Sequence, residues 1–129
     1  MARSSSSGDW KSVELPAFET LAGSNKTCGL SRHQWPRWAS DSTKFTRLLI
    51  HCPEADVSSS ETTAQIVARV FTERVDPQDA PQIFNYNLYL LAEATDGRLY
   101  QSGPIPTTEP RHRSSGPSTM FDEYGPPPI

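Results

Sequence analysis

The sequence predicts an all-β protein, an antiparallel β-sandwich of about five or six strands in a jelly-roll-like or Ig-like arrangement, with extended N- and C-terminal tails. Three observations support this prediction. An alternating segment at 83–95 runs into Asp96-Gly97 and a second short apolar and polar segment, which is typical of a hairpin with a type I′ turn. An apolar run occupies 43–52, and β-branched residues are frequent between 58 and 75.

The chain has 129 residues, of which 35% are hydrophobic, and the apolar residues gather in its middle. Residues 1–9 are rich in serine and predict a flexible N-terminal arm. Residues 10–105 can form a single β-rich domain with one small core. Residues 106–129 are rich in Pro and Ser but carry several aromatic side chains, which is typical of a docking tail.

The first part of the domain predicts little regular structure. Pro16 interrupts any helix between 10 and 22, so we expect an extended segment whose apolar side chains lie on the core. Residues 23–42 predict a long loop, with Trp35 and Trp38 as its large anchors.

The run at 43–52 predicts a strand that Pro53 ends. Its continuous apolar stretch suggests cover on both faces. Simple alternation divides its side chains into two sets, one with Phe45, Leu49 and His51 and the other with Leu48, Ile50 and Cys52.

The segment 58–75 is ambiguous. Its β-branched content favours a strand, because these side chains are stiff at χ1 and suit a sheet. The alternative is an α+β fold with a helix at 59–75, which Ser58 and Glu61 could begin as a capping box.

The long strand at 83–95 predicts a core face and a second, exposed face. The second face carries Tyr89 and Leu91 as candidate contact residues. The core face is formed by alternate residues: Phe84, Tyr86, Leu88, Leu90 and Ala92.

The sequence indicates a protein that is not an enzyme and that needs no cofactor. His51 and Cys52 are neighbours in a strand, so their side chains point to opposite faces and form no nucleophile–base pair. Two cysteines without histidines at fixed spacing predict no metal site. No signal-peptide core and no membrane-spanning apolar run occur, so we expect no membrane span, no classical secretion, and a location in a virion or the cytoplasm.

Four basic residues make RNA a candidate partner: Arg32, Arg37, Lys44 and Arg47. Cations interleaved with tryptophans can neutralise phosphates and stack on unpaired bases. The same residues serve equally well as loop anchors, with Arg stacked on a Trp face. The net charge of −3 and the lack of a basic arm favour this second interpretation.

Protein contact is the function that the composition favours, because large aromatic residues dominate interfaces. Its candidate interface residues are Trp35, Trp38, Tyr89, Leu91, Phe121 and Tyr124. The expected partners are copies of the chain or other subunits of an assembly.

The stretches FTRLLIHCPEAD, AQIVARVFTERV and YNLYLLAEATDGRLYQSGPI resemble, in texture, the coat or projecting domains of small RNA viruses. The resemblance covers residues 43–105 and implies a β-sandwich that works in assembly, as a structural capsid or capsid-accessory protein. The start MARSSSSGDW departs from the basic arm of many coat proteins. Two alternatives stay open: a cellular protein–protein interaction module that binds a peptide or a charged partner surface, and a small α+β nucleic-acid or regulatory protein.

Overall fold

The structure, a computed structural model, describes residues 9–40, 43–54, 87–106 and 125–128. The N-terminal arm, the segment 58–75 and the first part of the predicted 83–95 strand lie outside these residues. The described elements are, in chain order, β1 (Lys11–Ser12), α1 (Leu15–Ala22), β2 (Thr27–Gly29), the 3-10 helix η1 (Arg32–Gln34), α2 (Arg37–Ser40), β3 (Phe45–His51), β4 (Asn87–Ala94), β5 (Leu99–Gln101) and β6 (Ile105–Pro106).

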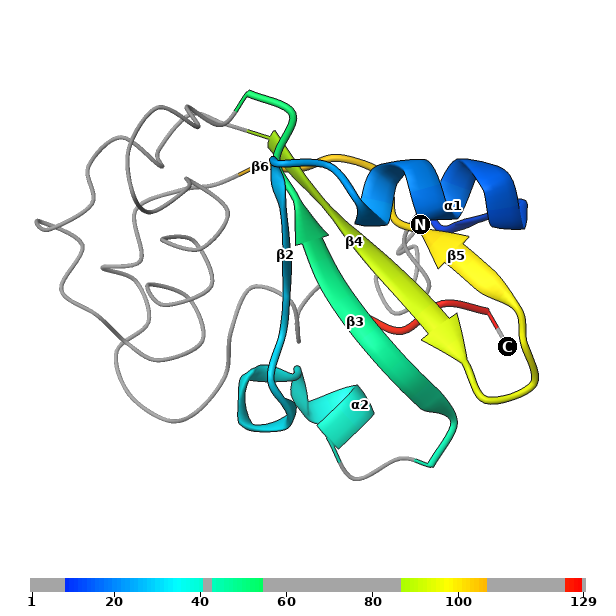
Figure 1. Cartoon of the computed structure of the whole chain (residues 1–129). Coiled ribbons are helices and arrows are strands. Elements are labelled where there is room, and N and C mark those ends of the chain that lie inside the picture. The colour runs from blue at the N-terminus through cyan, green and yellow to red at the C-terminus, as the bar shows by residue number, and fades with distance from the viewer. Residues whose placement is uncertain (1–8, 41–42, 55–86, 107–124, 129) are drawn as a thin grey trace, which may run out of the picture.

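The strands form an antiparallel sheet in the order β1-β5-β4-β3-β2, and β6 pairs with the beginning of β4 (Figure 1). The β-rich, antiparallel part of the predicted fold class is therefore confirmed. The sandwich stays a prediction, because residues 55–86 are not described.

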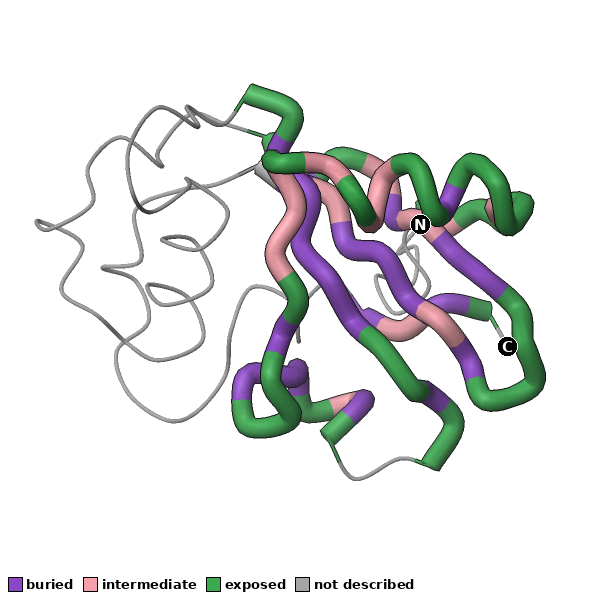
Figure 2. Tube along the Cα trace, in the orientation of Figure 1, coloured by how far each residue is buried: buried purple, intermediate pink, exposed green. Residues whose placement is uncertain are grey.

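The β3–β4 pair is the centre of the sheet, and both of its faces are covered. Leu48 and Ile50 of β3 pack in one buried cluster with Leu88 and Leu90 of β4. Leu49 lies between them in sequence and joins a second cluster under α1. Figure 2 shows buried stretches in both strands, and residues 48–52 and 90–92 are buried throughout. The predicted strand at 43–52 and its cover on both faces are confirmed.

Phe45 lies on the face of Leu48 and Ile50, so its predicted place beside Leu49 is wrong. The pairing of β3 with β4 shifts register between Phe45 and Arg47. Such an irregularity inserts an extra residue into one strand, so the strict alternation of side chains fails across it.

Residues 15–22 form helix α1, so the predicted extended segment is wrong there. Pro16 lies in the first turn of the helix. At this position its missing N–H costs nothing, because the first amides of a helix have no partner within it. The helix presents Phe18, which is fully buried, to Leu49 and Leu91 of the sheet.

The hairpin between β4 and β5 is confirmed, but its turn is not the predicted type I′. The amide of Gly97 donates to the carbonyl of Ala94 at 3.0 Å, and the amide of Ala94 donates to the carbonyl of Arg98 at 2.9 Å. The loop therefore has three residues, 95–97. Gly97 closes it with φ 94°, the left-handed conformation that three-residue hairpin loops place at this point.

Candidate functional site

Trp35 anchors the segment that carries η1 and α2 to the sheet. Its side chain is buried, and its Nε1–H donates to the carbonyl of Leu30 at 3.0 Å. The guanidinium of Arg32 lies 4.1 Å from the centre of the Trp35 ring. Upstream, the side chain of Gln34 accepts from the amide of Ser31 at 2.9 Å in a capping box that holds η1. The candidate interface residue Trp35 is thus occupied by its own chain.

Three aromatic side chains form a row beside this anchor, here named the aromatic shelf: Trp10, Trp38 and Phe45. The ring centres of Trp10 and Trp38 are 6.1 Å apart at 86°, and those of Trp38 and Phe45 are 5.6 Å apart at 71°. Both are edge-to-face contacts, the arrangement that aromatic quadrupoles favour. Phe45 belongs to the buried core, and the two tryptophans are half-buried against it. The shelf thus presents indole surface on a fixed base.

The described C-terminal segment, 125–128, lies against this shelf. The Nε1–H of Trp10 donates to the carbonyl of Gly125 at 3.2 Å, a contact between residues 115 positions apart in the sequence. Gly125 adopts φ 93°, a conformation that favours glycine. Pro127 is buried and Pro128 is exposed, so these neighbouring prolines differ in their access to solvent. Figure 1 shows it in red beside the sheet and apart from α1.

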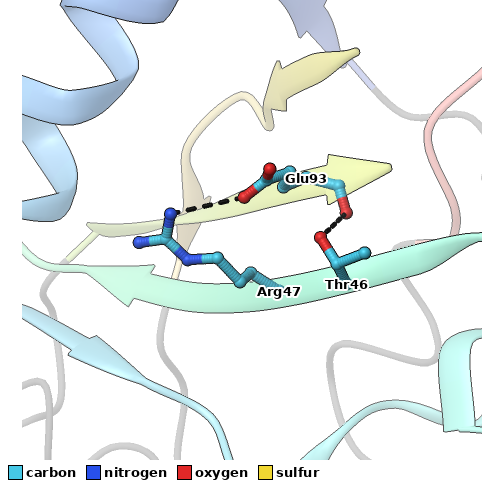
Figure 3. A network of polar contacts seen from close by, with 3 residues as sticks. All are labelled: Thr46, Arg47 and Glu93. Atoms are coloured by element: carbon cyan, nitrogen blue, oxygen red, sulfur yellow. Dashed lines mark hydrogen bonds and ion pairs between the residues drawn. The ribbon is translucent and has the colours of Figure 1, made fainter. Parts of the chain in front are cut away.

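The basic residues predicted for nucleic acid are not brought into one open patch. Arg47 forms an ion pair with Glu93 at 3.3 Å and lies 5.6 Å from the centre of the Phe18 ring. Thr46 donates to the main-chain carbonyl of the same glutamate at 3.3 Å, so β3 and β4 are joined at this point (Figure 3). Arg32, stacked on the ring of Trp35, has the contact that the alternative interpretation expected, and Arg47 is held by a carboxylate instead.

The other two predicted cations, Arg37 and Lys44, have exposed side chains on α2 and just before β3. Lys44 lines a shallow hollow of about 250 Å³ with Thr95, Asp96 and Arg98. The ion pair of Arg98 with Asp96, at 3.5 Å, brings a carboxylate into this hollow. An acidic group next to the cations makes the hollow a poor seat for a phosphate.

Leu91 is fully buried, so its predicted place on an exposed face is wrong. The alternation along β4 does point it away from Leu90, but α1 covers that face with Phe18. Tyr89 is half-buried, and its ring centre lies 6.3 Å from that of His51. The other two candidate interface residues, Phe121 and Tyr124, lie outside the described residues.

His51 is held by a short polar chain. The hydroxyl of Thr27 donates its one proton to the carbonyl of Leu21 at 2.6 Å, and Nδ1 of His51 lies 2.7 Å from the same hydroxyl oxygen. Nδ1 is therefore the donor to Thr27. Burial first, and then the charge of Lys26, lower the pKa of His51, which favours the neutral ring.

Cys52 lies in the core, where burial outweighs the two interactions that lower its pKa, a backbone hydrogen bond from Glu54 and the charge of Lys26. Its thiol is 3.7 Å from the carbonyl of Asn87, and burial raises its pKa. A protonated, buried thiol is a weak nucleophile. Cys28, in β2, and Cys52, which follows the last residue of β3, form no disulfide.

The described ranges contain no group of three or more His, Cys, Asp or Glu side chains placed to hold a metal ion. No helix within them is long and apolar enough to cross a membrane.

Sequence reasoning missed Trp10 as a site residue and missed the place where the tail docks. Composition predicted a docking tail at 106–129, but the contact of Gly125 with Trp10 joins residues near the two ends of the sequence and follows from no local pattern. The available signal was the pairing of a proline triplet with an unassigned tryptophan near the other end. The chain matches no protein-family model, no curated protein and no solved structure.

Proposed function

We propose that this protein is a structural, non-enzymatic component of a symmetric assembly, to which it contributes a rigid β-sheet body and a bridging C-terminal tail. Its partners are copies of itself or other subunits. The observation that carries the proposal is the seating of residues 125–128 on Trp10. A proline-rich tail with a defined binding position on a folded domain can link one subunit to the next.

The body has the rigidity that this role needs. Its central strands are buried on both faces, and the ion pair of Arg47 with Glu93 joins them at the surface. The tail has the complementary property. Prolines lose little backbone freedom on binding because their φ angles are already fixed, so an extended proline segment can bind through few contacts.

The resemblance to coat and projecting domains of small RNA viruses makes a capsid or capsid-accessory component the first setting to test. Nucleic acid enters this proposal only as cargo, because Arg32 and Arg47 already contact side chains of their own chain.

A second candidate is a cellular interaction module that binds a peptide, and the aromatic shelf favours it too. A tryptophan that donates its indole N–H to a peptide carbonyl beside prolines is a recurrent mode of peptide recognition. In this case the free protein is a monomer, and its tail is a ligand bound within the same chain.

Light scattering on a sizing column, with absorbance recorded at protein and nucleic-acid wavelengths, tests the proposal on the untagged chain. We expect a uniform particle much heavier than one copy. An excess of nucleic-acid absorbance in that peak would identify it as a filled capsid. A single monomer peak at every concentration would contradict the assembly proposal and favour the interaction module.

A further inference from the structure

We propose that the aromatic shelf is a receptor for the proline-rich segment 125–128 of a second copy, so that neighbouring copies exchange tails. This inference rests on the proposed function and names the site through which the tail bridges.

The shelf has the chemistry that recognises consecutive prolines. Residues 126–128 offer carbonyl oxygens and ring faces but no N–H donors, so a receptor must supply the donor and flat apolar surface. Trp10 supplies the donor through Nε1–H, and its ring, with that of Trp38, supplies the surface. The edge-to-face contacts of Trp38 with Trp10 and Phe45 hold these rings in place before the tail arrives.

The three adjacent prolines of the segment are buried to different extents. Pro127 is buried, Pro126 is half-buried and Pro128 is exposed. A tail lying loosely on an apolar surface would not bury one proline of three. The burial of Pro127 and the hydrogen bond to Gly125 therefore define a register in which the tail binds.

A second copy offers the same segment with the same contacts. Exchange of identical elements between copies makes no new contact and loses none, so its cost is small. The chain between Pro106 and Gly125 comprises residues 107–124. Fully extended, a connection of this length spans roughly 60 Å, whereas a domain of this size has a radius of gyration of about 14 Å. The tail can therefore reach the shelf of an adjacent copy.

The local concentration of tails decides whether the shelf binds the tail of its own chain or that of a neighbouring copy. Within one chain the tail competes at an effective concentration in the millimolar range, so the dilute protein seats its own tail. In an assembly the neighbours hold a second tail at a comparable local concentration, and exchange then links the copies.

Paramagnetic broadening between two copies tests this exchange on the full chain. One copy is wild type and labelled with ¹⁵N. The other is unlabelled and carries a nitroxide at its last residue, through Ile129→Cys in a Cys28→Ser background. At concentrations where association begins, we expect the indole N–H signal of Trp10 in the labelled copy to lose more than half of its height. The α1 amides, on the other face of the sheet, keep theirs.

Two matched variants of the nitroxide copy fix the register. Pro127→Asp places a charge in the buried position and should abolish the broadening, whereas Pro128→Asp places the same charge at the exposed position and should preserve it. Equal broadening with both variants would contradict the proposed register in which the tail binds the shelf. Circular dichroism of each variant by itself identifies one that fails to fold, and the pair without these substitutions still decides the exchange.

The mass of the same samples separates this inference from the proposed function. A heavy particle in which the nitroxide broadens the Trp10 signal no more than its reduced, diamagnetic form does would overturn tail exchange and leave the assembly proposal standing. A broadened Trp10 signal that ends at a closed dimer would support exchange and contradict the larger assembly. A monomer with a sharp signal would overturn both.

Discussion

Ser102 is a buried polar residue whose hydroxyl serves as the acceptor for a backbone amide of the sheet. It lies between β5 and β6, where the pairing with β4 shifts by one residue. Its Oγ accepts from the amide of Leu90 at 2.8 Å and donates to the carbonyl of Gly103 at 2.9 Å. The side chain thus satisfies a buried amide that the irregular ladder leaves without a carbonyl.

Replacing Ser102 with alanine should therefore lower the free energy of unfolding by about 1–3 kcal/mol, because the Leu90 amide stays buried without an acceptor. Urea denaturation measures this loss. The matched control is Ser40→Ala, since the Ser40 hydroxyl donates to the carbonyl of Arg37 at 3.3 Å on the exposed surface. Equal midpoints for the two variants would show that Ser102 makes no special contribution.

His51 should make stability depend on pH. Its pKa is lowered from 6.5 in the folded chain, by burial and then by Lys26, so the unfolded chain takes up the proton first as the pH falls. The stabilisation is present above the unfolded pKa and is lost progressively below it. The urea midpoint should therefore fall as the pH is lowered from about 8 to about 5. His51→Gln should remove the part of this pH dependence that is due to His51. His33→Gln, at an exposed position, should keep it; an unchanged slope in His51→Gln would contradict the assignment.

The turn between β4 and β5 depends on the backbone of Gly97. A Cβ at this position would meet no atom within 4 Å, but φ is +94°. Gly97→Ala should therefore destabilise the protein by about 1–2 kcal/mol through conformational strain alone. Gly29→Ala is the matched control, because a Cβ there also meets open space and its φ lies outside the positive range. Thermal denaturation should separate the two; equal melting temperatures would show that the turn tolerates alanine.

Helix α1 contributes to the stability of the fold mainly through the side chain of Phe18. The side chain of Phe18 is fully buried, whereas that of Leu15 on the same helix is 59% exposed. Phe18→Ala should lower the free energy of unfolding by about 3–5 kcal/mol, since it leaves a cavity over Leu49 and Leu91. Leu15→Ala should change it by less than about 1 kcal/mol. Similar losses in both variants, measured by urea denaturation, would contradict this packing of the helix.

At the scale of elements, the sequence predicted what depends on local periodicity. The β3 and β4 strands and the hairpin were predicted because alternation and Asp96-Gly97 are signals within a few residues. Helix α1 was missed because Pro16 was treated as a helix breaker, although it lies in the first turn. Leu91 was misplaced because alternation gives the face of a side chain and not what covers that face.

The candidate site was predicted in part. Trp35 and Trp38 were expected as loop anchors, and their contacts have this character. The seat of the tail could not be derived, because it joins residues 115 positions apart and no local pattern specifies such a contact. The alternative role of the arginines, stacked on aromatic rings, was foreseen from their spacing with the tryptophans and is seen for Arg32.

At the scale of the whole molecule, the described residues combine a sheet whose central strands are buried on both faces with a C-terminal segment that accepts a hydrogen bond from Trp10 at Gly125. The first property limits what the sheet can offer a partner, because Leu49 and Leu91 already lie under α1. The second provides a contact that can be made within one copy or between copies. Assembly through the tail is therefore the central claim of this account.

The native mass of full-length wild type and of its Pro127→Asp variant, measured together by light scattering, tests this claim most directly. We predict a uniform particle for the wild type, a single copy for Pro127→Asp, and a particle again for Pro128→Asp, whose charge lies at the exposed neighbouring position. Circular dichroism should be the same for all three. A wild-type chain that stays monomeric, or a Pro127→Asp variant that assembles as the wild type does, would contradict it.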